Sequence, residues 1–257
     1  ATPSHAVRQL SCQLRGMLDG ARSPPVVSVS KGLEQESLKT MTQILCETLD
    51  EPSVVALSGP SFAQEVYARQ PTAVVAASEH TEAAEMVQRA FANGYFRVYT
   101  SEDRMGVELG GALKNVIAIA AGVLHGLRLG HNAMAALITR GLAEMTRVGE
   151  AMGASPKTFA GLAGMGDLIL TATGTLSRNR TLGIELAKGR SLEEILSSRC
   201  TVAEGVHSAR AAVELAAKVG VELPIAVEVE HILFDGKSPE AAVRDLMERE
   251  LKAEQWR

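Results

Sequence analysis

The segment "ELGGALKNVIAIAAGVL" at residues 108–124 decides the fold, because it reads as an apolar helix with a single lysine, Lys114, in its middle. Its large apolar residues recur at the spacing of a helix face that packs on a core. The opposite face carries glycine, alanine and asparagine, so it is also suited to close packing. We therefore expect Lys114 to be at least half buried, with its pKa lowered toward the range useful for proton transfer. The alternative is a lysine whose stem covers apolar surface while its ammonium reaches water.

Composition narrows the function classes. The 257 residues are 46% hydrophobic, and a net charge of −4 with a pI near 5.9 predicts no basic surface for nucleic acid or an anionic membrane. The longest apolar run, residues 116–124, is too short to span a bilayer, so no stable membrane insertion is expected. Three cysteines outside any CxxC predict a reducing, cytoplasmic setting, and six histidines without metal-ligand spacing predict no metal.

The sequence changes character near residue 102. Before that point, short β-branched runs alternate with helix-like segments, and the runs lie at 25–30, 53–58, 71–78 and 96–100. After it, helical patterns follow one another at 104–127, 132–152 and 202–219, with further helices opened by Ser155-Pro156, by Ser191 with Glu194, and by Ser238-Pro239. We predict a partial doubly wound, Rossmann-like α/β sheet over residues 1–102, followed by an all-helical domain over residues 103–257.

Two strand ends of the α/β part carry polar groups. Lys31 follows the first strand in "VVSVSKGLE", and Gly59-Pro60-Ser61 join the second strand to a helix in "VVALSGPSFAQE". The carboxyl ends of such strands are where ligands bind, and a helix start offers free N–H groups. Taken singly, a solvated loop lysine and an ordinary strand-to-helix turn with proline at the helix start are the more frequent explanations of these features.

A third polar cluster lies in the helical part, at residues 161–183. Asp167 and Thr171 are four residues apart and therefore share a helix face, just after three glycines. The residues 177–180, "SRNR", combine two guanidiniums with a hydroxyl and an amide, and guanidinium holds phosphate oxygens in bidentate fashion. The alternative for this stretch is a solvated polar turn.

Six motifs together resemble one family. "KGLE", "SGPSFA", "ELGGALKN", "GMGDL", "SRNR" and "TVAEGV" stand in the order and rough spacing of bacterial NAD(P)-dependent glycerol-3-phosphate dehydrogenase. The resemblance implies an oxidoreductase that interconverts dihydroxyacetone phosphate and sn-glycerol 3-phosphate in the cytoplasm, with NAD or NADP, and supplies glycerol phosphate for phospholipids. A homodimer is compatible with this resemblance. No GxGxxG is present, so the resemblance also implies that the chain lacks the amino-terminal part of the dinucleotide-binding domain and is inactive without it.

Site residues follow from the resemblance by position. Lys114 is similar to the catalytic lysine that protonates the carbonyl oxygen. The expected substrate contacts are Lys31, Gly59, Ser61, Lys114, Asp167, Ser177, Arg178 and Asn179, with Asn115 and Thr171 as further substrate-side positions. The expected cofactor contacts are Lys31, Ala63, Arg178, Val202 and Glu204.

Two departures and two rival functions accompany this hypothesis. Arg128 stands where the family pattern leads us to expect glycine, and Arg104 stands where an apolar residue is more usual. A related β-hydroxyacid dehydrogenase or a ketopantoate-reductase-like enzyme also joins a dinucleotide domain to a helical domain with a catalytic lysine, but would not need the SRNR cluster. A non-catalytic helical scaffold is the alternative from another class, and the presence of Lys31, Lys114, Asp167 and Arg178 argues against it.

Overall fold

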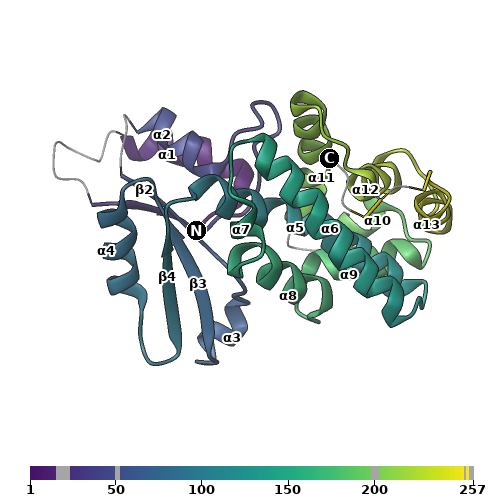
Figure 1. Ribbon diagram of the computed structural model, residues 1–257, viewed down its shortest axis with the longest axis horizontal. Helices are drawn as coiled ribbons and strands as arrows, with labels where there is room; N and C mark the ends of the chain where they lie inside the picture. Colours follow the sequence, from purple (N-terminus) through teal and green to yellow (C-terminus); the bar gives the residue numbers. More distant parts are fainter. Residues whose placement is uncertain (16–23, 50–52, 198–202, 252, 255–257) are drawn as a thin grey trace.

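The computed structural model describes residues 1–15, 24–49, 53–197, 203–251 and 253–254. A sheet with its helices forms one side of the molecule, and a group of helices forms the other (Figure 1). The elongated α5 (Arg104–Gly126) belongs to the helical side and also contacts the sheet. The predicted division into an α/β part and a following all-helical part is confirmed.

The α/β part contains all four predicted strands, in the spatial order β1-β2-β3-β4. Its elements are η1 (Ser4–Ala6), α1 (Val7–Arg15), β1 (Val26–Ser28), α2 (Met41–Thr48), β2 (Val54–Ser58), α3 (Ala63–Tyr67), β3 (Thr72–Ala77), α4 (Thr81–Phe91) and β4 (Phe96–Ser101). Successive side chains of β2 point to opposite faces, so Val55 and Leu57 pack with α4 whereas Ala56 packs with Val107 at the start of α5. Helices therefore cover both faces of the sheet.

The direction of the strands changes once within the sheet. β1 and β2 are parallel, β3 and β4 are parallel, and β2 pairs with β3 in antiparallel fashion. The connection through α3 thus returns the chain alongside β2 without a crossover. As a result, the carboxyl ends of β1 and β2 share one edge of the sheet, and Lys31 and Gly59 lie just beyond that edge.

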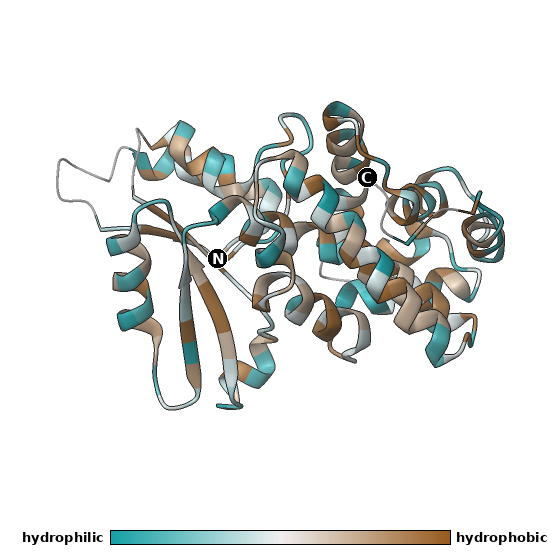
Figure 2. Cartoon of the chain, viewed as in Figure 1, coloured by the Kyte–Doolittle hydropathy of each residue, from teal (hydrophilic) through white to brown (hydrophobic). Residues whose placement is uncertain are grey.

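The helical part surrounds α5. Its other helices are α6 (His131–Ala151), α7 (Pro156–Phe159), the π-helix η2 (Leu162–Gly166), α8 (Asp167–Thr173), α9 (Arg178–Ala187), α10 (Leu192–Ser197), α11 (Glu204–Val219), α12 (Pro224–Phe234) and α13 (Pro239–Met247). By length and composition α5 could cross a membrane, but 94% of its most apolar 18-residue stretch is buried inside the protein. The hydrophobicity of α5 is therefore that of a core helix. In Figure 2 the visible helices of this side carry both brown, hydrophobic and teal, hydrophilic residues, as helices with one buried and one exposed face do.

Helix starts in this part follow the predicted capping chemistry. Ser191 and Glu194 exchange the two hydrogen bonds of a capping box at α10, and the Ser238 hydroxyl accepts from the Ala241 N–H at α13. The SRNR stretch is not a solvated turn: Ser177 is the N-cap of α9 and accepts from the Arg180 N–H. Helix α12 has no counterpart among the predicted segments, although Pro224 occupies its first turn.

The two departures from the family pattern have structural counterparts. Arg128 adopts a φ of +57°, a left-handed conformation just after α5 in which glycine is favoured, and this explains why glycine is expected there. The Arg104 guanidinium, at the start of α5, pairs with Glu79 at 2.6 Å and donates to the Cys46 sulfur. Neither side chain contacts Lys114 or Asp167.

A buried carboxylate joins the two parts of the molecule. Glu108, on α5, accepts hydrogen bonds from the Thr40 hydroxyl, the Thr42 hydroxyl and the Thr42 N–H at the start of α2. Burial raises the pKa of this carboxyl, while the threonine hydrogen bonds lower it in part. Glu108 thereby fixes α2, and the sheet beneath it, to the helix that carries Lys114.

A second buried carboxylate makes the stability of the helical part depend on pH. Glu144 of α6 accepts from the Ile225 N–H at 2.7 Å and the Ala226 N–H at 3.3 Å, and burial raises its pKa from 4.5 to about 7. The folded state therefore binds more protons than the unfolded state between these values, so stability falls as the pH rises from 4.5 through 7. We expect Glu144→Gln to remove this fall, which amounts to about 3 kcal/mol at most.

Urea unfolding at pH 5, 6, 7 and 8 measures the effect, with the exposed Glu150→Gln on the same helix as the matched control. Of the two variants, Glu144→Gln alone is expected to show a shallower dependence of unfolding free energy on pH. Equal slopes in the parent and in both variants would show that Glu144 does not titrate in this range.

Candidate active site

Lys114 is buried and donates two hydrogen bonds. Only 6% of the residue is exposed, and its Nζ donates to Asp167 Oδ1 at 2.6 Å and to Thr171 Oγ1 at 2.8 Å. Burial, followed by the charge of Lys31, lowers the pKa of Lys114 from 10.5 to about 8, although Asp167 acts in the opposite direction. The expectation of a buried lysine with a lowered pKa is confirmed, and the alternative of an ammonium reaching water is wrong.

Asp167 is the acceptor shared by two lysines. It is 1% exposed, and its second oxygen, Oδ2, accepts from Lys31 Nζ at 2.7 Å. Asp167 is the first residue of α8, directly after η2. The Thr171 hydroxyl donates to the Asp167 carbonyl at 2.6 Å, so toward Lys114 it must act as an acceptor. This pair one turn apart confirms the predicted common helix face.

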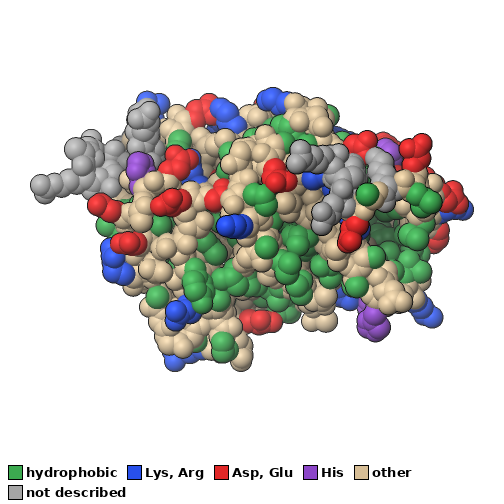
Figure 3. Space-filling model, in the orientation of Figure 1, with side chains coloured by type: hydrophobic (Ala, Val, Ile, Leu, Met, Phe, Trp, Pro, Cys, Tyr) green, Lys and Arg blue, Asp and Glu red, His purple; other side chains and the backbone are tan. Residues whose placement is uncertain are grey.

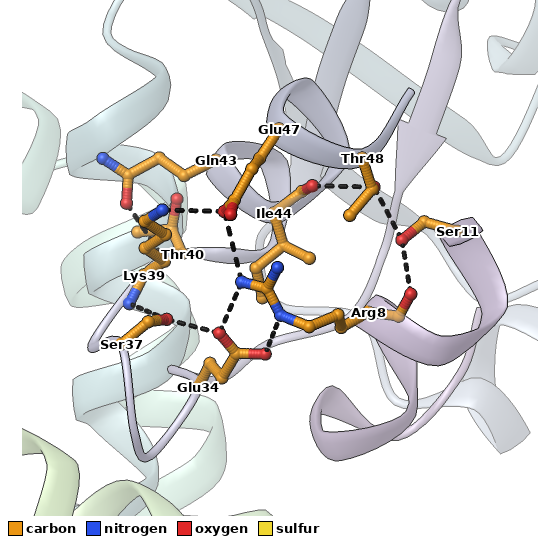
Figure 4. A network of polar contacts seen from close by, with 10 residues as sticks. All are labelled: Arg8, Ser11, Glu34, Ser37, Lys39, Thr40, Gln43, Ile44, Glu47 and Thr48. Atoms are coloured by element: carbon orange, nitrogen blue, oxygen red, sulfur yellow. Dashed lines mark hydrogen bonds and ion pairs between the residues drawn. The ribbon is translucent and has the colours of Figure 1, made fainter. Parts of the chain in front are cut away.

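Lys31 reaches the site from the loop after β1. Besides Asp167, its Nζ donates to the Gly59 carbonyl at 2.9 Å, and its side chain remains 21% exposed. The loop that follows is held by the ion pairs of Figure 4, in which Arg8 of α1 donates twice to Glu34, and Arg8 and Lys39 both contact Glu47 of α2. The sheet and its helices therefore fix the position from which Lys31 extends.

The turn after β2 closes the site from the other strand. Gly59 has a φ of +140°, and a Cβ there would lie 3.0 Å from the backbone of Val74, so only glycine fits without strain. Its carbonyl accepts from both Lys31 and the Ser61 hydroxyl, the latter at 3.0 Å. Ala63 is the first residue of α3 and is exposed.

A chain of amides connects Lys114 to the SRNR cluster. Asn115, the next residue on α5, accepts from the Asn179 side chain at 2.9 Å, and Asn179 in turn accepts from the Gly205 N–H at 3.0 Å. Arg178 precedes Asn179 and is exposed; within the described ranges its side chain makes no hydrogen bond or ion pair. The structure thus brings the start of α9 beside the lysine, with one guanidinium free to meet a ligand.

Glu204 connects the helical part back to the sheet. Its carboxylate accepts from the Ser4 N–H at 3.1 Å and from the Ser4 hydroxyl, at the start of η1. Gly32, next to Lys31, lies against both, since a Cβ there would be 2.8 Å from Ser4 Oγ and 3.4 Å from Glu204 Oε2. The expected cofactor contact Val202 lies outside the described residues.

The donors on the two lysines decide what the site can accept. Each ammonium has three N–H donors and uses two within the described part of the protein, so each has one donor for a ligand oxygen. Two ammoniums and one carboxylate also give the site a net positive charge, which suits a small anion. Where placement is described, no group of three or more His, Cys, Asp or Glu side chains could hold a metal ion.

The residues present fit the reactive end of a dinucleotide and not its pyrophosphate. Lys31 and the exposed Ala63 flank an edge of the sheet, as a nicotinamide beside the substrate requires. The GxGxxG sequence, whose turn provides a cradle of backbone N–H groups, does not occur in the 257 residues. Lys31 and Ala63 are therefore the described residues of this sheet edge that would lie beside a nicotinamide.

Family models match both parts of the chain. The model described as NAD-dependent glycerol-3-phosphate dehydrogenase C-terminus matches residues 103–244, and the model of the N-terminus of the same enzyme matches residues 1–84. The chain belongs to the NAD-dependent glycerol-3-phosphate dehydrogenase family. The resemblance that the six motifs indicated is confirmed.

Individual members of this family are close in sequence and structure. Glycerol-3-phosphate dehydrogenase [NAD(P)+] from Geobacter metallireducens is 54% identical over 257 residues, which cover 98% of this chain and 76% of that protein. The Myxococcus xanthus protein of the same name is also 54% identical, over 99% of this chain and 76% of its own length. The crystal structure of glycerol-3-phosphate dehydrogenase from Coxiella burnetii has a TM-score of 0.92 and 38% identity, and the match covers 96% of this chain and 75% of that one.

These matches favour glycerol-3-phosphate dehydrogenase over the rival functions. NAD or NADP is accordingly the cofactor of the family, and neither the ketopantoate-reductase hypothesis nor the scaffold hypothesis is better supported.

Sequence reasoning did not identify Ser4 as the partner of Glu204 or Gly205 as the donor to Asn179. The signal for Ser4 was a serine at the start of a helix, where hydroxyls often hydrogen-bond.

Proposed function

We propose that this glycerol-3-phosphate dehydrogenase family member interconverts dihydroxyacetone phosphate and sn-glycerol 3-phosphate with Lys114 as the acid and base. The observation that supports the proposal most strongly is the single buried carboxylate of Asp167, which holds Lys114 and Lys31 at 2.6 and 2.7 Å. A buried lysine with a pKa near 8 exists in both protonation states around neutral pH, as an acid–base group needs.

In the reducing direction, the free N–H of Lys114 donates to the carbonyl oxygen of the substrate. The nicotinamide, when bound, supplies the hydride to the carbonyl carbon. As the oxygen gains negative charge, the Lys114 proton passes to it, so the product is an alcohol and Lys114 is left neutral. Water restores its proton after product leaves, and in the oxidising direction neutral Lys114 accepts the hydroxyl proton.

The neighbours of Lys114 orient it and hold the substrate. Asp167 and Thr171 occupy two of its three donors, which fixes the direction of the third. The remaining N–H of Lys31 reaches a substrate oxygen beside Gly59 and Ser61, and Lys114 itself also contacts the substrate. Because each donor is already directed before the substrate binds, little reorganisation accompanies proton transfer.

The phosphate binds at the start of α9. Arg178 is exposed, free of intramolecular partners in the described ranges, and placed beside Ser177 and Asn179 at a helix N-terminus, where backbone N–H groups favour an anion. Asn115 and Thr171 complete the substrate side. Toward NAD or NADP, the chain contributes Lys31, Ala63, Arg178, Val202 and Glu204.

The wider organisation follows from the same proposal. Residues 1–102 contribute to the dinucleotide-binding domain, and residues 103–257 form the substrate and catalytic domain. Side chains of both charges are interspersed on the face in Figure 3, in keeping with a cytoplasmic enzyme that does not insert into membranes and does not bind nucleic acid. A homodimer is the proposed assembly.

The phosphate assignment gives the test of the proposed function. Arg178→Lys keeps the charge but loses the bidentate fork, so we expect KM for dihydroxyacetone phosphate to rise by about 10-fold, the value of one lost charge-assisted contact. Activity toward unphosphorylated dihydroxyacetone should change little. Steady-state kinetics on the protein as its gene encodes it measure both, with exposed Arg89→Lys of α4 as the matched control.

Equal losses on both substrates would show that Arg178 does not bind phosphate. Faster turnover of ketopantoate than of dihydroxyacetone phosphate by the parent protein would overturn the proposed function itself.

A further inference from the structure

The two consecutive glycines of α5 lie against the segment that leads into Asp167 and against the side chain of Lys31. A Cβ on Gly110 would lie 2.6 Å from the Ala163 carbonyl oxygen in η2, the turn that leads directly into Asp167. A Cβ on Gly111 would lie 3.3 Å from Cγ and 3.5 Å from Cδ of Lys31. Gly110 therefore admits the backbone before Asp167, and Gly111 admits the side chain of Lys31.

Gly111 also faces a buried hydroxyl that has no hydrogen-bond partner in the described structure. Ser58, the last residue of β2, is 5% exposed, and its Oγ would lie 2.9 Å from a Cβ on Gly111. Leaving a hydroxyl buried without a partner costs about 1–3 kcal/mol, so hydrogen bonding does not explain this side chain. Its place explains it better: the Ser58 hydroxyl and the Lys31 stem both lie beside Gly111, where a Cβ would meet them.

We propose that Gly111 is a positioning residue for Lys31, whose stem packs closely beside this position because it lacks a side chain and is thereby directed to Asp167. The proposal rests on the proposed function only in so far as Lys31 takes part in the reaction. Lysine has four flexible carbons and loses about 2 kcal/mol of side-chain freedom when it is fixed. The Lys31 side chain is 21% exposed, so packing of its stem reduces the freedom that must be lost when the ammonium pairs with Asp167.

The electrostatics of the site supply a readout specific to this role. Lys31 is the second largest cause of the lowered pKa of Lys114, after burial. If Gly111→Ala displaces the Lys31 ammonium, the pKa of Lys114 should rise, and any limb of the pH profile that reports Lys114 should move to higher pH. A substitution that merely disturbs packing would lower stability without moving that limb.

Gly111→Ala is compared with Gly126→Ala at the other end of α5. A Cβ on Gly126 would lie 2.6 Å from the Ala187 side chain, so this control crowds the same helix away from the site. Amine-selective labelling of this chain, read by mass spectrometry, reports the accessibility of Lys31 without cofactor or turnover. We expect Gly111→Ala to raise the Lys31 labelling rate several-fold and, in the protein as its gene encodes it, to lower kcat/KM by about 10-fold or more.

A second variant keeps the test decisive if Gly111→Ala folds poorly. Gly111→Ala combined with Ser58→Ala removes the nearest clash, so stability should recover while Lys31 labelling stays above that of the parent. Parent-like Lys31 labelling and an unmoved pH limb in both variants would overturn the proposal. Lys31→Met separates the role of Lys31 in the reaction from the role of Gly111 in positioning it. If Lys31→Met keeps full activity, the role of Lys31 in the proposed function is wrong. The labelling of Lys31 in Gly111→Ala still decides the role of Gly111.

Discussion

Replacing Lys114 with methionine should lower kcat by about 100-fold or more, the scale of general acid–base catalysis, and should not destabilise the protein. Methionine keeps the length and the apolar stem and removes only the ammonium, so the packing of α5 changes little. The reaction loses its proton donor, and the Lys31 ammonium, which also pairs with Asp167 in the described structure, extends from the loop after β1 and not from α5.

The effect on stability has a definite sign. The pKa of Lys114 is lowered in the folded state from 10.5 to about 8, so the folded protein binds fewer protons than the unfolded chain between these values. The unfavourable contribution is therefore complete below pH 8 and disappears as the pH rises toward 10.5. At pH 7, Lys114→Met should have the melting temperature of the parent or a higher one.

Kinetics and thermal unfolding of the same preparations test both halves of this prediction. Lys39→Met is the matched control, since Lys39 is 41% exposed and pairs with Glu47 outside the site. A Lys114→Met protein that turns over within a few-fold of the parent but melts earlier would mean that Lys114 is structural and that Lys31 is the candidate acid.

Asp167→Asn should be the most damaging isosteric change to the site. It leaves two ammoniums facing a neutral amide, and breaking a buried ion pair in this way costs about 3–5 kcal/mol. Loss of the carboxylate also lowers the pKa of Lys114 further, because Asp167 is the group that raises it. We expect kcat to fall by about 100-fold or more at pH 8, with the acid form of Lys114 depleted.

Two companion variants show whether the damage is electrostatic. Asp167→Asn combined with Lys31→Met removes one of the unpaired charges, so it should be more stable than Asp167→Asn alone, and a double-mutant cycle measures the difference. Glu108→Gln neutralises another buried carboxylate of the protein and should alter stability without altering the pKa of Lys114. Additive effects of Asp167→Asn and Lys31→Met would contradict the shared ion pair.

Local patterns predicted those features of the fold that depend on neighbouring residues. The apolar spacing of residues 108–124 predicted both the buried helix and its buried lysine, and Ser191 with Glu194 predicted the capping box of α10. The reversal between β2 and β3 was not predictable in this way, because strand direction depends on pairing between segments that are distant in sequence.

The candidate site likewise combines features that neighbouring residues predict with contacts that depend on long-range packing. Asp167 and Thr171 could be placed on one helix face from their spacing, but their contact with Lys114, 53 and 57 residues away, depends on how η2 and α8 pack on α5. The role of the Gly110–Gly111 pair was equally hidden, since a glycine records only that something approaches closely. What approaches, here the turn before Asp167 and the stem of Lys31, is visible only in three dimensions.

The pH dependence of kcat/KM in both reaction directions tests the central claim that Lys114 transfers the proton. Lys114, with a pKa near 8, must be protonated when dihydroxyacetone phosphate is reduced and neutral when glycerol 3-phosphate is oxidised. The rate of reduction should therefore fall, and the rate of oxidation should rise, as the pH passes through about 8. Limbs of the same sign in both directions, or limbs that remain in Lys114→Met, would contradict the assignment.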